Sequence, residues 1–325
     1  ANKLVRWSWF RIIRRGREFY PIDKDKMKGY NLYHSPFHPI PSEINASTQI
    51  KKLITIHDLI PKIHPEYFGA WHHQNADRIL EGLRKDTYIS CVSESTKNDL
   101  KRFKPNLSDE QISVIPLAAD KNLFYPVEDI MQIWNVKEKY GIPIDLPYIL
   151  SVSTVEPRKN LFRTLEAFKE VINEDKSNLC SLVLVGSKGW KMADFYNIIA
   201  KDNSLKGRVI LTGFVEDIDL APLYTGASVF VYPSLYEGFG LPVLEAMQCG
   251  VPVITSATSS LPEVCGDIGL LVNPFSVHEI ASAIYQLLNE TRGERRNSLL
   301  DRANMFSWSK FDSSYGQLYQ QIYTS

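Results

Sequence analysis

Cysteine is scarce in this sequence, and its distribution argues against the common cysteine-based sites. Only four cysteines occur in 325 residues, namely Cys91, Cys180, Cys249 and Cys265. No Cys-x-x-Cys pair and no cluster of cysteine with histidine is present, so we expect no structural zinc site. Widely spaced cysteines are typical of free thiols in a reducing compartment, which predicts a cytoplasmic protein.

Long hydrophobic runs and an excess of one charge are also missing. No stretch approaches the roughly 20 apolar residues that span a bilayer, and the order of a signal peptide is not recognisable. Lys plus Arg number 37 and Asp plus Glu number 37. A balanced chain is a poor candidate for a general nucleic-acid binder, so we expect no nucleic-acid partner. Hydrophobic residues make up 44%, the composition of an ordinary globular protein.

The first residues are basic and amphipathic. The sequence begins at Ala1 and has six Lys or Arg residues before its first acidic residue, Glu18. On a helical wheel Val5, Trp9 and Ile12 share one side, and the basic residues take the other. Such a helix can lie in an anionic membrane interface, which predicts peripheral contact with the inner membrane face. The alternative is a helix of the first domain whose arginines are solvated or contact phosphates.

Short β-branched and apolar runs alternate with helical patterns along most of the chain. This alternation predicts parallel sheets that are covered by helices on both faces. Two such series, separated by the proline-bounded segment 143–147, predict two Rossmann-like domains over residues 1–145 and 146–306. Hydrophobic residues at helical spacing then predict a final helix within 307–325. Ligands of such sheets bind at the carboxyl ends of the strands, so the residues after each strand are the candidate site.

Basic residues follow the strand expected over 148–153. Residues 156–160 read E-P-R-K-N and lead into a helical pattern, with Asn160 at the position of its N-cap. Two cations beside a helix N-terminus suit an anion, because the N–H groups and the helix dipole attract it and the side chains neutralise it. The alternative is a solvated basic pair. We favour an anion site at Arg158 and Lys159.

A glycine-containing loop with two acidic residues follows a later predicted strand. Residues 233–247 read P-S-L-Y-E-G-F-G-L-P-V-L-E-A-M, with Glu237 before the glycines and Glu245 on a predicted helix. Glycines let the backbone approach a ligand closely, and the helix N–H groups suit phosphate. Carboxylates repel phosphate but accept hydrogen bonds from hydroxyl groups. This pattern fits a diphosphate flanked by two sugars, and the alternative is a tight loop with two surface acids.

Two common phosphate-binding motifs are missing from the sequence, and a common metal-binding motif occurs only as often as chance predicts. No complete G-x-G-x-x-G follows a strand, and the spacing around residues 186–189 does not make a Walker A loop. D-x-D occurs at 23–25 and at 217–219. A chain with this aspartate content produces such matches by chance, so we expect no metal site.

Several motifs in order resemble the retaining GT-B glycosyltransferases of family 4. The loop and helix over 237–247 resemble the family's E-x7-E motif, and 250–254 resembles the strand that follows it. The segment 156–160 and the inter-sheet loop over 115–126 also resemble it, and the resemblance runs from about Leu53 to the C-terminus. It implies a GT-B fold of two parallel-sheet domains facing a cleft, with a last helix that crosses back to the first domain.

The resemblance also implies roles for individual residues. Lys159 would bind the donor diphosphate and stabilise the leaving group, Glu245 would hold the ribose, and Glu237 the transferred sugar. His57, after the strand at Leu53–Ile56, would lie near the donor sugar; the alternative is a histidine bonded to backbone at a strand end. The other donor-lining residues would be Gly238, Phe239, Gly240 and Leu241 at the phosphates and sugar, Phe214 and Val215 at the base, and Gly186 and Ser187 at a neighbouring strand end.

Two departures from the family pattern are visible. Many relatives have an arginine where this chain has Ser153, which makes Arg158 a candidate substitute. Relatives also begin with a strand and a Gly-rich loop, whereas this chain reaches a later strand near Asn31, so its first domain is expected to lack that strand and loop.

These features predict a retaining, metal-independent hexosyltransferase that uses a UDP- or GDP-hexose and a glycan or lipid-linked acceptor. It would need no cofactor besides the donor substrate. The rival hypotheses are a nucleotide-sugar epimerase or phosphorylase on the same fold, and a non-catalytic protein that binds nucleotide or glycan.

Overall fold

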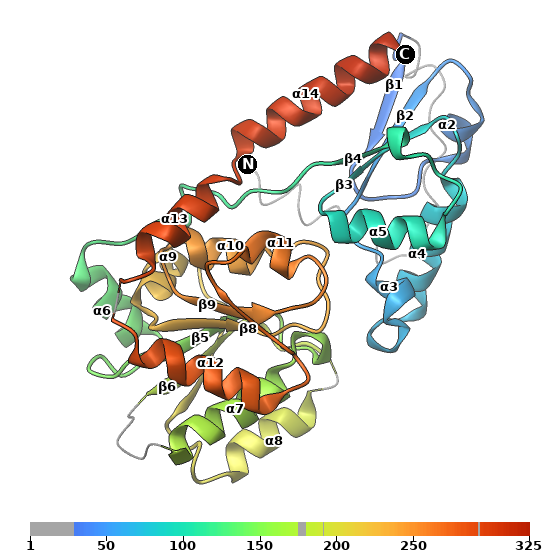
Figure 1. The fold of residues 1–325 in the computed structure, drawn as a ribbon. Helices are drawn as coiled ribbons and strands as arrows, with labels where there is room; N and C mark the ends of the chain where they lie inside the picture. The colour runs from blue at the N-terminus through green and yellow to red at the C-terminus, as the bar shows by residue number, and fades with distance from the viewer. Residues whose placement is uncertain (1–28, 175–179, 191, 292) are drawn as a thin grey trace.

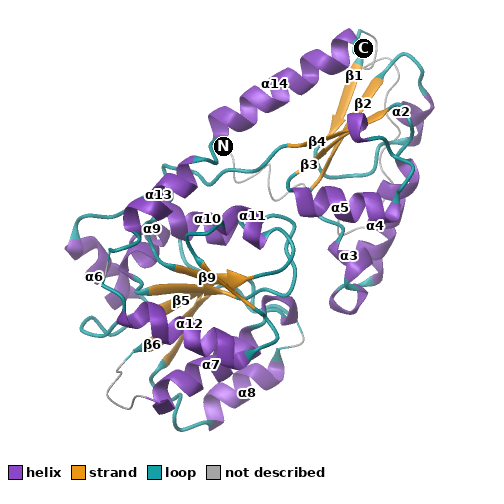
Figure 2. Cartoon of the chain, in the orientation of Figure 1, coloured by secondary structure: helices purple, strands orange, loops and turns teal. Residues whose placement is uncertain are grey.

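The structure, a computed structural model, describes residues 29–174, 180–190, 192–291 and 293–325. The basic N-terminal segment, with the membrane contact predicted for it, lies outside these residues. Two parallel sheets, each packed against helices, make up the described chain (Figures 1 and 2). Within this part of the chain, no helix is both long enough and apolar enough to cross a membrane.

The first sheet has four parallel strands in the order β1-β2-β3-β4. Its strands are β1 (Leu32–Ser35), β2 (Lys51–Ile56), β3 (Thr87–Cys91) and β4 (Ile112–Val114), and the helices of this part are α2 (Ser42–Ala46), α3 (Ile60–Ile63), η2 (Pro65–Tyr67), α4 (Ala70–Gly82), α5 (Glu94–Phe103) and η3 (Asp109–Gln111). Successive residues of β2 face opposite sides of the sheet. Ile54 packs in the core beneath α4 and α5, while Leu53 packs against the last helix, α14 (Trp308–Thr324).

The second sheet has six parallel strands in the order β10-β9-β8-β5-β6-β7. The strands are β5 (Tyr148–Val152), β6 (Ser181–Val185), β7 (Val209–Gly213), β8 (Val229–Tyr232), β9 (Val253–Ser256) and β10 (Leu270–Val272). The chain moves from β5 outward to β6 and β7, and then returns to place β8 on the other side of β5. The strand order therefore reverses beside β5, and a crevice at the carboxyl ends of β5 and β8 is where such sheets bind ligands.

Helices cover both faces of the second sheet. One face packs against α7 (Leu161–Glu174), α8 (Ala193–Lys201) and α12 (Val277–Asn289). The other face packs against α6 (Ile130–Lys139), α9 (Asp217–Gly226), α10 (Leu241–Gln248), α11 (Leu261–Cys265) and α13 (Arg296–Asn304). Ile149 faces the first group, and its neighbours Tyr148 and Leu150 face the second. Coverage on both faces explains why these strands read as continuous apolar runs.

Two helices join parts of the chain that lie far apart in sequence. α6 lies upstream of the boundary expected at residue 145, yet its Ile133 and Val136 pack in the core of the second domain. Figure 1 shows α14 running from the second domain to the sheet of the first. There the Tyr315 hydroxyl lies 2.7 Å from both Thr55 Oγ1 and Ser90 Oγ. The C-terminal helix is therefore anchored to the first sheet by buried hydrogen bonds as well as by apolar contacts.

Candidate functional site

Two loops that follow adjacent strands form the centre of the site. η4 (Pro157–Lys159) comes after β5, and the loop over residues 233–240 comes after β8, which pairs with β5. Asn160 binds the loops together, since its side-chain amide donates to the carbonyls of Pro233 at 2.9 Å and Pro274 at 2.6 Å. Its backbone has a φ of 62°. Asn160 does directly precede α7, and its carbonyl accepts the N–H of Thr164 at 3.1 Å. Its side-chain oxygen, however, accepts from Arg163 Nη1 at 2.9 Å, and the structure shows no bond from it to a backbone N–H of α7.

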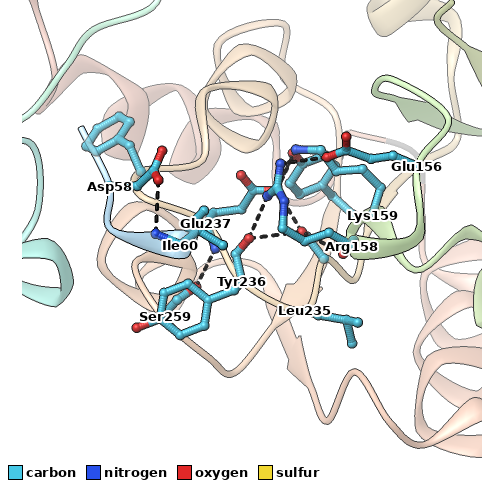
Figure 3. A network of polar contacts seen from close by, with 12 residues as sticks. Asp58, Ile60, Glu156, Arg158, Lys159, Leu235, Tyr236, Glu237 and Ser259 are labelled. Atoms are coloured by element: carbon cyan, nitrogen blue, oxygen red, sulfur yellow. Dashed lines mark hydrogen bonds and ion pairs between the residues drawn. The ribbon is translucent and has the colours of Figure 1, made fainter. Parts of the chain in front are cut away.

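Glu237 lies at the middle of a buried cluster of donors (Figure 3). Its Oε1 lies 2.6 Å from Lys159 Nζ and 2.8 Å from Arg158 Nη1. The hydroxyls of Tyr232 and Ser234 donate to the same oxygen at 2.8 and 2.6 Å. Burial alone would raise the pKa of Glu237, but the charges of Lys159 and Arg158 outweigh it and lower that pKa to about 2. Glu237 is thus a carboxylate throughout the physiological pH range.

The two cations make different contacts. Lys159 Nζ also donates to the Tyr232 hydroxyl at 2.6 Å, and burial lowers the pKa of Lys159 while Glu237 opposes that change. Arg158 fixes the loops, because it donates to the Tyr236 carbonyl at 2.6 Å and to Glu156 at 2.8 Å. Arg158 Nε has no hydrogen-bond partner among the described residues. Because this Nε–H is buried, Arg158 acts through its charge and through the bonds that it makes to the two loops.

Glu245 has a different environment from Glu237. It lies on α10, and the Tyr224 hydroxyl donates to its carboxylate at 3.0 Å. Burial raises the pKa of Glu245 to about 7, and the hydrogen bond from Tyr224 opposes this only in part. α10 starts after Gly240, whose φ is 113°. A Cβ at Gly240 would also lie 2.8 Å from Leu261, so both the backbone and the space favour glycine.

The first domain contacts the site directly, so the cleft is closed in this structure. A Cβ on Gly238 would overlap the His57 carbonyl oxygen, which follows β2. Ser93 Oγ donates to the Gly238 carbonyl at 2.7 Å. The Glu263 carboxylate of the second domain accepts the backbone N–H groups of Glu94 at 2.8 Å and Ser95 at 2.7 Å, the first residues of α5. Carboxylate and helix N-terminus attract each other across the two domains.

His57 lies beside this contact, on the first domain. Its Nε2 is 2.9 Å from the Pro36 carbonyl oxygen, and its ring centroid is 6.0 Å from that of Phe37. Asp58, the next residue, accepts the N–H of Ile60 at 3.0 Å and belongs to the same group of polar residues in Figure 3. The His57 ring therefore bonds a backbone carbonyl, while the backbone of His57 lies against the loop that carries Glu237.

The remaining predicted residues lie around this centre. Phe239 is buried, with its ring 5.8 Å from that of Phe306, and Leu241 is half-buried at the start of α10. Val215 is buried in the core after β7, while the neighbouring Phe214 is 75% exposed. Of these two residues, Phe214 is the one whose side chain is accessible to a ligand.

Gly186 and Ser187 form the edge of the loop next to β5. A Cβ on Gly186 would overlap the Ser153 carbonyl oxygen, and Gly186 has a φ of 140°, so only glycine fits. The Ser187 carbonyl accepts the N–H of Val155 at 3.1 Å. Ser153, where many relatives of the resembled family have arginine, donates its N–H to the Val185 carbonyl at 2.9 Å.

Sequence reasoning missed Tyr232 and Ser234. Tyr232 ends a buried strand and looks like a core aromatic, so its position beside Glu237 would have been the only signal.

Of the D-x-D pairs, Asp219 lies in α9, where it accepts from Lys139 Nζ and the Tyr140 hydroxyl, both at 2.7 Å. Within the described ranges, no three His, Cys, Asp or Glu residues are grouped as metal ligands would be.

Comparisons with known proteins point to one family. Residues 132–304 match the family described as glycosyl transferases group 1. O-antigen chain mannosyltransferase B of Escherichia coli is 33% identical over 280 residues, which cover 85% of this chain and 71% of that protein. Serotype-specific mannosyltransferase WbdA of Escherichia coli is 29% identical over 266 residues, 80% of this chain but only 32% of its own length. The chain thus spans about a third of the longer relative.

Solved structures agree on the fold. The solved structure of sucrose-phosphate synthase from Thermosynechococcus elongatus superposes with a TM-score of 0.75 at 26% identity, covering 93% of this chain and 76% of that one. A glycosyltransferase of lipopolysaccharide biosynthesis, WaaG, superposes with a TM-score of 0.70 at 18% identity, covering 90% and 78%.

Proposed function

The chain belongs to the group 1 glycosyl transferases and has their GT-B fold, and we propose that it is a retaining, metal-independent member of family 4 type. As a glycosyltransferase it takes a nucleotide sugar as donor and a glycan as acceptor. We propose a UDP- or GDP-hexose as the donor and a hydroxyl of a growing glycan or a lipid-linked sugar as the acceptor. The names of the two Escherichia coli relatives support mannose as the hexose.

One observation carries the proposal: Lys159 and Glu237 meet at 2.6 Å at the carboxyl ends of β5 and β8. A donor diphosphate has the charge that Lys159 needs, and a hexose has the hydroxyls that Glu237 needs. When the donor enters, Lys159 would leave Glu237 and bind the diphosphate, and Glu237 would bind the hydroxyls of the hexose. No buried charge is then left without a partner, which keeps the desolvation cost of binding low.

The proposed chemistry uses these residues in separate roles. Lys159, with the positive charge of Arg158 beside it, stabilises the negative charge that develops on the departing diphosphate, a role that a metal ion would otherwise fill. The acceptor hydroxyl attacks the anomeric carbon on the face that the diphosphate leaves. Its proton passes to a phosphate oxygen of the leaving group, so no covalent carboxylate intermediate forms. Glu237 holds a sugar hydroxyl, and Glu245 holds the ribose.

The first domain would complete the site by closing over it. The backbone carbonyl of His57 lies against Gly238, and its imidazole, which bonds the Pro36 carbonyl, would turn to a hydroxyl of the donor sugar. Contact between the two domains also excludes water from the electron-poor anomeric carbon, which favours transfer over hydrolysis.

A donor panel with product analysis tests the proposal. Purified protein is incubated with UDP-glucose, GDP-mannose and a mannose oligosaccharide, and the release of nucleoside diphosphate and the anomeric configuration of the product are measured. We expect an α-linked product from an α-linked donor. An inverted product would refute retention, and conversion of the sugar without any acceptor would favour the epimerase. Transfer is expected to survive EDTA; activity that vanishes and returns with Mn²⁺ would refute metal independence.

A substitution at the central pair tests the site itself. Lys159→Ala should lower turnover by about 10²–10³, because one charge-stabilising donor is lost. Lys169→Ala, on the outer surface of α7, serves as the matched control. Normal turnover of Lys159→Ala would remove Lys159 from the mechanism.

A further inference from the structure

A row of aromatic rings leads away from the candidate site across both domains. Tyr236, next to Glu237, has its ring 5.3 Å from that of His64, and His64 lies 5.7 Å from Tyr67. The adjacent Phe68 lies 5.3 Å from His72, whose ring is 5.1 Å from that of Trp71. We call these six residues the aromatic row. They belong to the loop after β8 and to the segment from α3 to the start of α4, which projects from the first domain beside the second (Figure 1).

The row is held in position at the end near the site. The Tyr236 hydroxyl donates to the Asp99 carboxylate, with both oxygens 2.7 Å away, and the Tyr236 carbonyl accepts from Arg158. The Tyr67 carbonyl accepts the indole N–H of Trp190 from the second domain at 3.1 Å. These bonds fix ring positions without using the ring faces. The end of the row near the site is therefore preorganised.

Exposure increases along the row with distance from the site. His64, Tyr67 and Phe68 are half-buried, whereas Trp71 is 49% exposed and Trp190, at the side, is 43% exposed. Rings left half in water next to a cleft mark a binding surface more often than a core. A nucleic acid would need a basic surface, which this neutral chain does not favour.

A sugar chain fits such a surface better. The C–H faces of a hexose stack on aromatic rings, while its hydroxyls stay in contact with water or with polar groups along the edge. Glu66, His73 and Gln74 supply polar groups beside the rings, and the spacing between the rings is comparable to the length of one sugar residue.

We propose that the aromatic row binds the acceptor glycan, holding the sugars that lie behind the residue whose hydroxyl is glycosylated. The proposal rests on the function proposed above, because a track for a glycan chain is useful only where a glycan is extended. It adds the expectation that the enzyme prefers an oligosaccharide to a monosaccharide, since a single sugar at the reacting position would not reach Trp71.

Substitution at the exposed end tests the row with little risk to folding. Mannose oligosaccharides of one to four residues, and the matching glucose series, are compared as acceptors of the wild-type protein, Trp71→Ala and Trp71→Phe. Loss of one stacking ring should raise the KM for the tetrasaccharide about 3- to 10-fold. It should leave kcat, the monosaccharide KM and donor hydrolysis without acceptor unchanged. Trp71→Phe should restore most of the affinity. Trp134→Ala, at a 41% exposed position on α6, is the matched control and should behave as wild type.

The outcomes separate this proposal from the function it rests on. The proposal for the aromatic row would be overturned by equal KM values of the wild type for one and four sugars, or by an unchanged tetrasaccharide KM in Trp71→Ala. Either result would leave the proposed transferase function standing. A protein with no transfer or hydrolysis would instead contradict the function. In that case the row is still tested by direct titration, where indole N–H signals are followed by NMR while mannotetraose or maltotetraose is added. Movement of the Trp71 signal supports the row, and no response to either sugar refutes it.

Discussion

Donor affinity should depend on pH through Glu245. The pKa of this carboxyl is raised to about 7 by burial, and its proposed role is to accept hydrogen bonds from the ribose hydroxyls. Only the carboxylate can accept two such bonds, so binding the donor requires Glu245 to be ionised. The free protein must therefore release a proton before it binds, and lower pH weakens binding. Glu237, with a pKa of about 2, remains ionised and contributes no such dependence.

The size of the effect follows from the raised pKa. With a pKa of about 7, roughly nine tenths of Glu245 is ionised at pH 8 and roughly one tenth at pH 6. The donor Kd should therefore rise about tenfold from pH 8 to pH 6, with most of the change between pH 7 and pH 6. The intact nucleotide sugar is the right ligand, because its phosphates do not titrate in this range, whereas the terminal phosphate of a free nucleoside diphosphate does.

Calorimetric titration of the wild type, Glu245→Gln and Glu138→Gln at pH 6, 7 and 8 measures this. Glu245→Gln should bind more weakly at pH 8 and show no dependence on pH, since its amide cannot ionise. Glu138→Gln, an exposed acid on α6, should follow the wild type. An unchanged wild-type Kd across this range, or a dependence that persists in Glu245→Gln, would refute the assignment of Glu245 to the ribose.

Three further results are expected. Glu245→Gln should also change the pH dependence of stability. Glu245 binds its proton more tightly in the folded than in the unfolded chain, so its contribution to the unfolding free energy should fall by about 3 kcal/mol as pH rises from its ordinary pKa of 4.5 to about 7. Denaturant titrations of wild type and variant across this window should differ by that contribution, and parallel pH profiles would refute the raised pKa. Gly238→Ala should lose most transfer in the donor-release assay, because its methyl group would overlap the His57 carbonyl oxygen of the first domain. Normal transfer would show that this close contact is not needed. Tyr315→Phe should lower the unfolding free energy by about 1–3 kcal/mol, because the buried hydroxyls of Thr55 and Ser90 each lose a hydrogen-bond partner. Tyr323→Phe, at a 74% exposed position, should leave the unfolding free energy unchanged. Equal effects of the two substitutions would refute the buried anchor.

The fold class was predictable because strands that are covered on both faces appear in the sequence as short apolar runs. The run expected to be a strand at Leu53–Ile56 lies in β2, and the class of two parallel-sheet domains is confirmed. α6 was not predicted, although Ile133 and Val136 have helical spacing. The prolines at 143–147 looked like the boundary between two domains, and no local pattern reveals that α6 packs forward onto α9.

The site was predictable in its parts but not in its contacts. Lys159 and Glu237 were each identifiable from their positions after strands, yet they are 78 residues apart in the chain. Only the pairing of β5 with β8 makes them neighbours, and strand order cannot be read from local patterns. The same limit explains Asn160, whose side chain was expected to serve the nearest helix and instead bonds two loops that fold against it.

The contact between Glu263 and α5 makes the first turn of a helix in one domain depend on the other domain. Within the first domain, the Ser93 hydroxyl caps α5 by accepting the N–H of Thr96. The N–H groups of Glu94 and Ser95 instead donate to the carboxylate of Glu263, which belongs to the second domain. When the cleft opens, these two amides lose that acceptor together and become accessible to solvent, while the cap at Thr96 remains. Hydrogen exchange at Glu94 and Ser95, measured against exchange at Thr96, therefore reports how often the unliganded protein opens, and bound donor should slow the first two amides alone.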